Sequence, residues 1–172
     1  KVAGENGLSV ALLERKESIA AIQRSCQTMV AIEDEYYFGE RMFLDEKQHR
    51  IVFPVNNFSV RYDGPHKNFY AWHVYTPDGK HCVKMGDYEA KKSGGSRTRL
   101  SAFYSKQHLL QGLLDDALAS GVQVFSGTNV IGHKRAGETN AILTADGKTY
   151  RGTFTIAADG INSRLVKLLG LN

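Results

Sequence analysis

The stretch that decides the fold stands at the end of the sequence: TFTIAADGINSRLVKLLGLN, residues 153–172. Its first part, Thr153 to Ala158, is an apolar run typical of a buried strand. Asp159-Gly160 follows at once, and Asn162-Ser163 marks the start of a helix. The stretch therefore predicts a buried strand that ends in an acidic turn and leads into a helix.

Two interpretations of this turn are open. In the first, Gly160 lets a ligand approach the backbone closely, and Asp159 bonds a polar atom of that ligand. The helix from about Asn162 then points its free N–H groups toward the same ligand. In the second, Asp159 only caps the helix and the turn is structural. The stretch alone does not decide between a binding site and a turn.

The other end of the sequence adds a second acidic strand end. KVAGEN, residues 1–6, has the character of the last turns of a helix that stops at Gly7. LSVALLERK, Leu8 to Lys16, is an almost continuous apolar run, as in a strand buried on both faces of a parallel sheet. Glu14 lies near its carboxyl end, where a dinucleotide's ribose binds and a carboxylate can accept both ribose hydroxyls. Charged residues also end strands that bind nothing, so Glu14 alone is a weak indication.

A ribose-binding acid of this kind lies roughly 20 positions beyond a glycine-rich phosphate loop. Counting back from Glu14 places that loop, and the strand before it, ahead of Lys1. Ligands of open α/β sheets bind beyond the carboxyl ends of the strands. We therefore expect Glu14 and Asp159 to lie at the same edge of one sheet, on strands that are adjacent or one strand apart.

The middle of the sequence has a different pattern. Between Ile51 and Met85, short aromatic and β-branched segments alternate with turn signals, which predicts three or four antiparallel strands. These segments are IVFPV, FSVRY, NFYAWHVYT and KHCVKM. An aromatic cluster within them either lines a ligand cavity or forms the packed face of a small sheet, and general burial favours the packed face. Its members are Phe69, Tyr70, Trp72 and Tyr75.

After the middle segment the α/β pattern returns. Ser105 can cap a helix that runs to about Ser120, with leucines at helical spacing, and Gly121 ends it. VQVFSGTNVIGHK and AILTADGKTY then predict strands, with a hairpin turn at residues 145–148. An α/β frame thus encloses an antiparallel excursion, which suggests two lobes.

The two chain ends together resemble the flavoprotein monooxygenase and geranylgeranyl-reductase group, the class with the aromatic-hydroxylase fold. In that group the second strand ends in Glu-Arg or Glu-Lys, matched here by Glu14-Arg15. A helix, a strand and a hairpin then lead to G-A-D-G-x-x-S, matched by residues 157–163 with Ala157 for the first glycine. The resemblance covers about half of the chain, and the order and spacing are more specific than either motif.

The resemblance implies an α/β fold. Residues 1–30 and 100–172 would be a portion of an FAD-binding, Rossmann-like sheet, and residues 31–99 an inserted antiparallel β portion of the substrate domain. FAD is the implied cofactor, with NAD(P)H as its reductant and a small apolar or aromatic substrate that is hydroxylated or reduced. The flavin carries the chemistry, so no catalytic side chain is assigned. The implied cofactor-binding residues are Glu14, Arg15, Arg24, Lys106 (or its neighbour Gln107), Asp159 and Gly160.

The sequence departs from the group's pattern in several places. The first strand with its G-x-G-x-x-G loop and the later Gly-Asp motif are absent, and Val166 stands where relatives often carry arginine. We therefore expect a fragment that does not by itself hold FAD tightly, and whose open strand edge invites self-association. The alternative is a non-catalytic α/β binding or scaffold domain whose Asp-Gly turn is structural.

Composition excludes several other classes of protein. Hydrophobic residues make up 42% and charged residues 23%, as in soluble globular proteins. No run reaches the roughly 18 apolar residues of a membrane helix, and the N-terminus does not resemble a signal peptide, so the cytoplasm is expected. The basic stretch at residues 91–99 lacks interleaved aromatics, which argues against nucleic acid. Cys26, Cys82 and the six histidines show no metal-ligand spacing apart from His73 and His81, which flank a turn and are too few for a zinc site. Reduced thiols and no metal are therefore expected.

Overall fold

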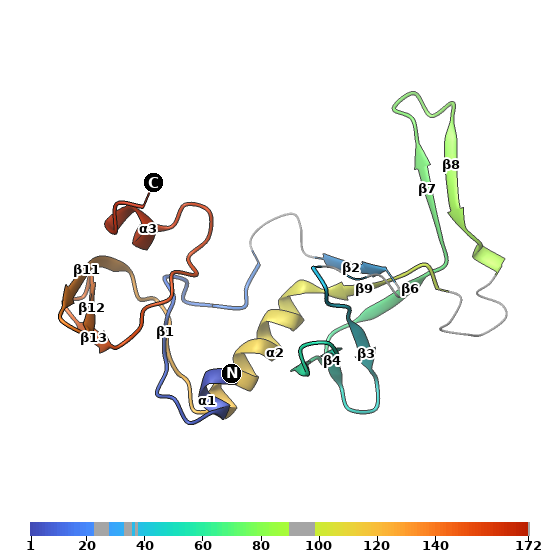
Figure 1. The fold of residues 1–172 in the computed structure, drawn as a ribbon. Coiled ribbons are helices and arrows are strands. Elements are labelled where there is room, and N and C mark those ends of the chain that lie inside the picture. Colours follow the sequence, from blue (N-terminus) through green and yellow to red (C-terminus); the bar gives the residue numbers. More distant parts are fainter. Residues whose placement is uncertain (23–27, 33–35, 37, 90–98, 172) are drawn as a thin grey trace. The chain divides into compact units, whose positions relative to one another are not determined.

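The computed structural model describes residues 1–22, 28–32, 36, 38–89 and 99–171 (Figure 1). The chain folds as two compact units. The first unit consists of residues 1–19 and 120–172, and the second of residues 20–119. These bounds place residues 100–119 in the same unit as the antiparallel strands, and not with the two chain ends.

The first unit combines a parallel strand pair with an antiparallel meander. β1 pairs in parallel with β10, with Ala11 opposite Gln123 and Leu13 opposite Phe125. β11, β12 and β13 form a three-stranded antiparallel sheet in that order. The elements are α1 (Val2–Glu5), β1 (Ala11–Leu13), β10 (Gln123–Phe125), β11 (Val130–Ala136), β12 (Thr139–Thr144), β13 (Thr149–Gly152) and α3 (Arg164–Leu168).

Several local predictions for this unit are confirmed. The helix at the N-terminus ends before Gly7, which has a positive φ of 75°. The predicted hairpin joins β12 to β13 through Gly147, whose φ of 82° suits a residue without a side chain. The parallel pairing of β1 with β10 agrees with an α/β arrangement, because parallel neighbours need a crossover between them.

One strand prediction is too long, and another is wrong. The strand expected over Leu8 to Lys16 is three residues long, and Leu8 is 64% exposed. The run from Thr153 to Ala158 is not a strand, and Phe154 is 88% exposed. A strand exists only where a neighbour satisfies its backbone groups. Among the described residues β1 has a strand neighbour on one side alone, and the later run has none.

In its described residues, the second unit contains three antiparallel sheets and one α-helix. Their strand orders are β2-β9-β6, β3-β4-β5 and β7-β8. The strands predicted between Ile51 and Met85 are confirmed, as is the helix after Ser105. The elements are β2 (Thr28–Ile32), β3 (Phe43–Asp45), β4 (Arg50–Phe53), β5 (Phe58–Arg61), β6 (His66–Phe69), β7 (Ala71–Tyr75), β8 (Cys82–Gly86), β9 (Ser101–Ser105) and α2 (Lys106–Ala119).

The core of the second unit lies where sheets and helix meet. Its fully buried residues are Ile51, Tyr62, Ala102 and Tyr104, and the two tyrosine rings meet edge to face at 5.7 Å. Helix α2 packs closely on β5, since a Cβ atom at Gly112 would lie 1.7 Å from the Arg61 carbonyl oxygen.

The aromatic cluster of the middle segment does not gather around one cavity. Phe69 packs edge to face on Phe103 at 6.5 Å. Trp72 and Tyr75 are an odd number of residues apart on β7, so they lie on opposite faces of the β7-β8 ribbon. Tyr75 is 59% exposed. The interpretation as a shared ligand cavity is therefore wrong.

Candidate functional site

Glu14 follows the last residue of β1, as predicted for an acidic strand end. Its backbone continues the ladder with the β10 side, because its N–H donates to Phe125 O at 3.0 Å and its carbonyl accepts from Thr128 N at 2.8 Å. The carboxylate Oε1 accepts the N–H of Lys16 at 2.9 Å. Within the described part of the chain, the second oxygen, Oε2, has no partner. Half-buried Glu14 therefore keeps one oxygen able to accept a ligand hydroxyl.

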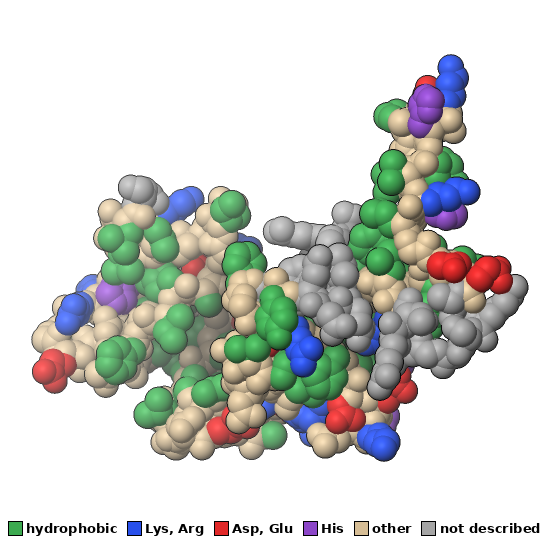
Figure 2. Space-filling view, turned by 45° about the vertical axis from the view of Figure 1, so that its right-hand side comes forward, with side chains coloured by type: hydrophobic (Ala, Val, Ile, Leu, Met, Phe, Trp, Pro, Cys, Tyr) green, Lys and Arg blue, Asp and Glu red, His purple; other side chains and the backbone are tan. Residues whose placement is uncertain are grey.

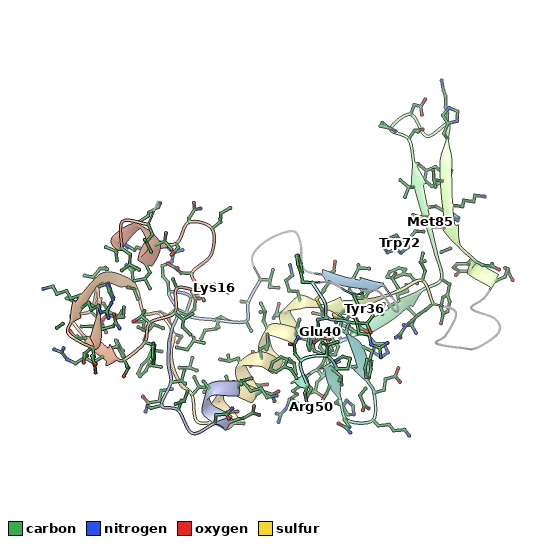
Figure 3. The ribbon with its side chains drawn as sticks, in the orientation of Figure 1. Lys16, Tyr36, Glu40, Arg50, Trp72 and Met85 are labelled. Atoms are coloured by element: carbon green, nitrogen blue, oxygen red, sulfur yellow. The ribbon has the colours of Figure 1, made fainter. Side chains whose placement is uncertain are left out.

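Two basic residues follow Glu14 directly. Arg15 is exposed. The Lys16 ammonium donates to the carbonyl of Ile19, three residues further along the chain, at 2.5 Å. Lys16 is labelled in Figure 3. Both residues place positive charge next to Glu14, and exposed Arg15 can meet an anionic ligand in solvent.

Asp159 is the organising residue of the Asp-Gly turn. Its Oδ1 accepts from the Ser163 hydroxyl at 2.5 Å, and its Oδ2 accepts the N–H groups of Arg164 at 2.6 Å and Leu165 at 3.2 Å. The hydrogen bond from the Ser163 hydroxyl has the largest effect in holding the pKa of Asp159 below its ordinary value, and the hydrogen bonds from these N–H groups add to it. The carboxylate therefore caps α3, as in the structural interpretation of the turn.

The free N–H groups expected at the start of α3 are not free. Asp159 takes those of Arg164 and Leu165, and the Ser163 hydroxyl accepts that of Val166 at 3.0 Å. That expectation is wrong because a serine four residues after an aspartate completes the cap within the chain. A ligand at this turn has to find its donors before the helix.

Such donors exist in the turn itself. Gly160 has a φ of 84°, and no atom lies within 4 Å of the position that a Cβ would take. In the part of the chain that the structure describes, the N–H groups of Gly160, Ile161 and Asn162 donate to no protein acceptor. These three consecutive donors face solvent beside an open backbone. An oxygen-rich ligand can accept hydrogen bonds from them.

A short path of hydrogen bonds joins the surroundings of Glu14 and Asp159. Thr128, bonded to Glu14, precedes Asn129, whose side-chain oxygen accepts from the Arg164 guanidinium at 3.5 Å. Arg164 in turn bonds Asp159. The backbone of Glu14 and the side chain of Asp159 are thus linked through Thr128–Asn129 and Arg164. Since residues 153–158 form no strand, Asp159 ends no strand, and the expectation that Glu14 and Asp159 end strands at the same edge of one sheet is wrong.

The remaining predicted cofactor residues lie in the second unit or outside the described residues. Lys106 is the first residue of α2 and belongs to the second unit, and Gln107 follows it. Arg24 lies in residues 23–27, outside the described residues, as does Cys26. The roles of Arg24 and Lys106 stay predictions.

A buried tyrosine that follows β5 and bonds to the residue before α2 was not predicted from the sequence. The Tyr62 hydroxyl donates to Pro65 O at 2.6 Å and accepts the N–H of Ser105 at 2.7 Å. Burial raises the pKa of Tyr62. Ser105 and His108 hold a side-chain contact of 2.8 Å across the first turn, which the Ser-x-x-His spacing could have indicated. This network fixes the junction of β9 and α2.

The described residues contain neither a cluster of metal ligands nor a membrane-spanning helix. Over the described ranges, no group of three or more His, Cys, Asp or Glu residues is arranged to hold a metal ion. No helix in those ranges is both long and apolar enough to cross a membrane.

The fold is similar to that of solved enzymes, among them a flavin-dependent monooxygenase. The chain is similar to FqzB, with a TM-score of 0.60 at 17% identity over 98% of this chain and 35% of that one. It is also similar to the Diels-Alderase PyrE3 of pyrroindomycin biosynthesis, with a TM-score of 0.58 at 16% identity over 97% and 30%. The flavin-dependent monooxygenase PieE, solved with FAD and substrate, matches with a TM-score of 0.51 at 16% identity over 98% and 29%.

These comparisons establish the fold alone. The chain spans about a third of the length of the solved structures that it matches. No known protein family matches the sequence. A search of curated proteins also gave no match.

Proposed function

We propose that these 172 residues are part of an FAD-dependent oxidoreductase and that Glu14 binds the adenosine ribose of the cofactor. The observation that carries the proposal is the position of Glu14, directly after β1 of the parallel pair β1-β10, in a chain whose fold is similar to that of a flavin-dependent monooxygenase. Its open carboxylate oxygen suits a ribose hydroxyl, which is a donor. Bound FAD would supply the hydride and electron chemistry.

In this proposal Asp159 is a positioning residue and not a ligand contact. Its carboxylate is committed to α3, which holds the turn in place. The N–H groups of Gly160, Ile161 and Asn162 then donate to oxygen atoms of the cofactor. This assignment changes the role predicted for Asp159 while keeping Gly160 at the site.

The other implied parts follow from the same resemblance. Arg15, Arg24 and Lys106 offset the charge of the cofactor's diphosphate. NAD(P)H serves as reductant, and a small apolar or aromatic substrate is hydroxylated or reduced. The antiparallel strands of the second unit contribute to the substrate domain, and the first unit to the FAD-binding domain.

The test is flavin retention after a change at Glu14. A charge-assisted hydrogen bond is worth about 1.5–3 kcal/mol. In the protein that carries these residues, Glu14→Gln should therefore raise the Kd of FAD about 10- to 100-fold, measured by fluorescence titration and by flavin absorbance after gel filtration. Glu17→Gln, an exposed glutamate three positions on, is the matched control and should leave the Kd unchanged. Equal retention by both variants would contradict the proposal.

A second candidate function is a non-catalytic α/β binding or scaffold domain. The observation that favours it is the complete capping of α3 by Asp159, which gives the Asp-Gly turn a structural purpose. Under this alternative, Glu14→Gln changes surface charge alone. Wild-type protein that does not bind FAD in the titration, while folding normally by circular dichroism, would favour the scaffold.

A further inference from the structure

The ribbon formed by β7 and β8 has free edges. Strand β7 pairs antiparallel with β8 from Ala71 opposite Gly86 to Tyr75 opposite Cys82. No third strand joins this sheet among the described residues. Figure 1 shows the ribbon extending from the end of β6. A two-stranded ribbon is at best marginally stable in water, so a further partner would stabilise it.

The two faces of the ribbon differ in chemistry. Cross-strand partners share a face, and Trp72 pairs with Met85 while Val74 pairs with Val83. This apolar face is open, because Val74 is 54% and Val83 63% exposed. Figure 2 shows hydrophobic side chains along the ribbon, and Figure 3 labels Trp72 and Met85 on its two strands. The opposite face carries His73 with Lys84 and Tyr75 with Cys82.

The hydrogen-bond pattern shows which backbone groups point outward. The Thr76 N–H donates to His81 O at 3.0 Å, so these two residues form a hydrogen-bonded pair. Hydrogen-bonded and non-hydrogen-bonded pairs alternate along an antiparallel ladder. The pair His73–Lys84, three steps further along, is therefore non-hydrogen-bonded. The N–H and C=O groups of His73 point out from the β7 edge, and those of Lys84 point out from the β8 edge.

The two edges are not equally protected. Strand β8 carries Lys84 at its centre, and a lysine on an edge strand discourages pairing with another copy. Strand β7 reads Ala-Trp-His-Val-Tyr, with no lysine, arginine, acidic residue or proline. The β7 edge is thus the one open to a new strand.

We propose that β7 pairs antiparallel with β7 of a second copy of this chain, about a twofold axis at His73. This register pairs His73 with His73 and Ala71 with Tyr75, whose backbone groups all point outward. It also sets Trp72 opposite Val74 of the other copy. The apolar face then runs without a break across four strands, in rows of Met85, Trp72, Val74 and Val83. The equivalent β8 dimer would place Lys84 against Lys84.

The interaction surface uses none of the residues proposed for the FAD site. It is small, so the dimer is weak and forms with increasing concentration. The register distinguishes it from association through the open edge of β1, which involves none of these residues.

Proline substitution at each edge provides a matched test. His73→Pro removes an outward N–H of β7, and Lys84→Pro removes the outward N–H of its partner on β8; neither N–H belongs to the ladder between them. Sedimentation velocity over a concentration series, on protein with the complete sequence, measures dimer formation. Fluorescence of Trp72, the single tryptophan, reports whether the ribbon stays intact.

The expected result separates the two variants. Wild type and Lys84→Pro should form dimers with similar Kd, and His73→Pro should raise the dimer Kd at least tenfold. Tryptophan emission should be the same for all three proteins at concentrations where each is a monomer. Wild type that stays monomeric at every concentration overturns the proposal. The proposal is also overturned if His73→Pro and Lys84→Pro both associate like wild type, or if both lose association.

Discussion

Helices α2 and α3 are held in place by opposite means. Helix α2 has 14 residues and lies against β5, with Gly112 at the closest approach and the Asp116 carboxylate 2.5 Å from the Arg50 guanidinium. Helix α3 has five residues, of which Leu165 alone is buried, and it begins in the hydrogen bonds of Asp159 and Ser163. Packing thus fixes the first helix, and polar capping fixes the second. The comparison predicts that substitutions around α2 cost more stability than substitutions around α3.

The largest effect is expected at Gly112. In Gly112→Ala the new methyl group would lie against the Arg61 carbonyl, which is backbone and cannot turn aside. Overpacking costs typically 1–3 kcal/mol and at times more, so we expect a loss of about 3 kcal/mol in the free energy of unfolding. Urea denaturation followed by circular dichroism measures it. The neighbouring change Gln111→Ala, at an exposed position of the same helix, should cost under about 0.5 kcal/mol.

A somewhat smaller effect is expected at Asp116. This side chain is 7% exposed, pairs with Arg50, and also accepts the Arg61 N–H at 3.2 Å. Asp116→Ala removes the acceptor of the Arg61 N–H and the carboxylate that pairs with Arg50, which keeps its hydrogen bonds to Ser59. Breaking a fully buried pair costs about 3–5 kcal/mol, but Arg50 keeps 24% exposure, so we expect about 2 kcal/mol. A double-mutant cycle with Arg50→Met measures the coupling, and a coupling near zero would show that packing alone holds α2.

The smallest of the three effects is expected at Asp159. Asp159→Ala removes the side chain that caps α3, and loss of a cap costs about 1 kcal/mol. Thermal unfolding compared with wild type measures the change. A loss above that of Asp116→Ala would reverse the comparison between the helices.

The same carboxylate predicts a dependence on pH. The pKa of Asp159 lies below its ordinary value of 3.8 in the folded protein. Its contribution to stability is therefore fully present above that value and is lost as the pH falls through the lowered, folded pKa. The stability difference between wild type and Asp159→Asn should shrink as the pH is lowered below about 4. Urea midpoints of both proteins from pH 7 to pH 2.5 measure it, and a constant difference would contradict the prediction.

The sequence predicted those elements whose causes are local. Leucines at helical spacing and Gly121 predicted α2, and Pro77-Asp78-Gly79 predicted the turn of the β7-β8 ribbon. The acidic end of β1 was also located correctly at Glu14. Each of these signals lies within a few neighbouring residues.

The parts that the sequence did not predict depend on distant partners. Thr153 to Ala158 has the composition of a strand, but a strand also needs a neighbour for its backbone, which composition does not report. The choice between ligand and cap for Asp159 depended on where Ser163 points. The role of Tyr62 could not be predicted from the sequence, because it depends on burial and on two hydrogen bonds formed in the fold.

The exposed run before the Asp-Gly turn has a consequence for proteolysis. Phe154 is 88% exposed and Ile156 87%, in a segment outside any sheet, and proteases bind their substrates as extended chains. Chymotrypsin should therefore cut after Phe154 sooner than after Phe125, which is half-buried against Tyr150 at 4.8 Å. If another strand covers this run in the working protein, Phe154 becomes the protected site instead. The order of the two cuts, followed by mass spectrometry, thus reports whether the sheet of the first unit has gained a strand.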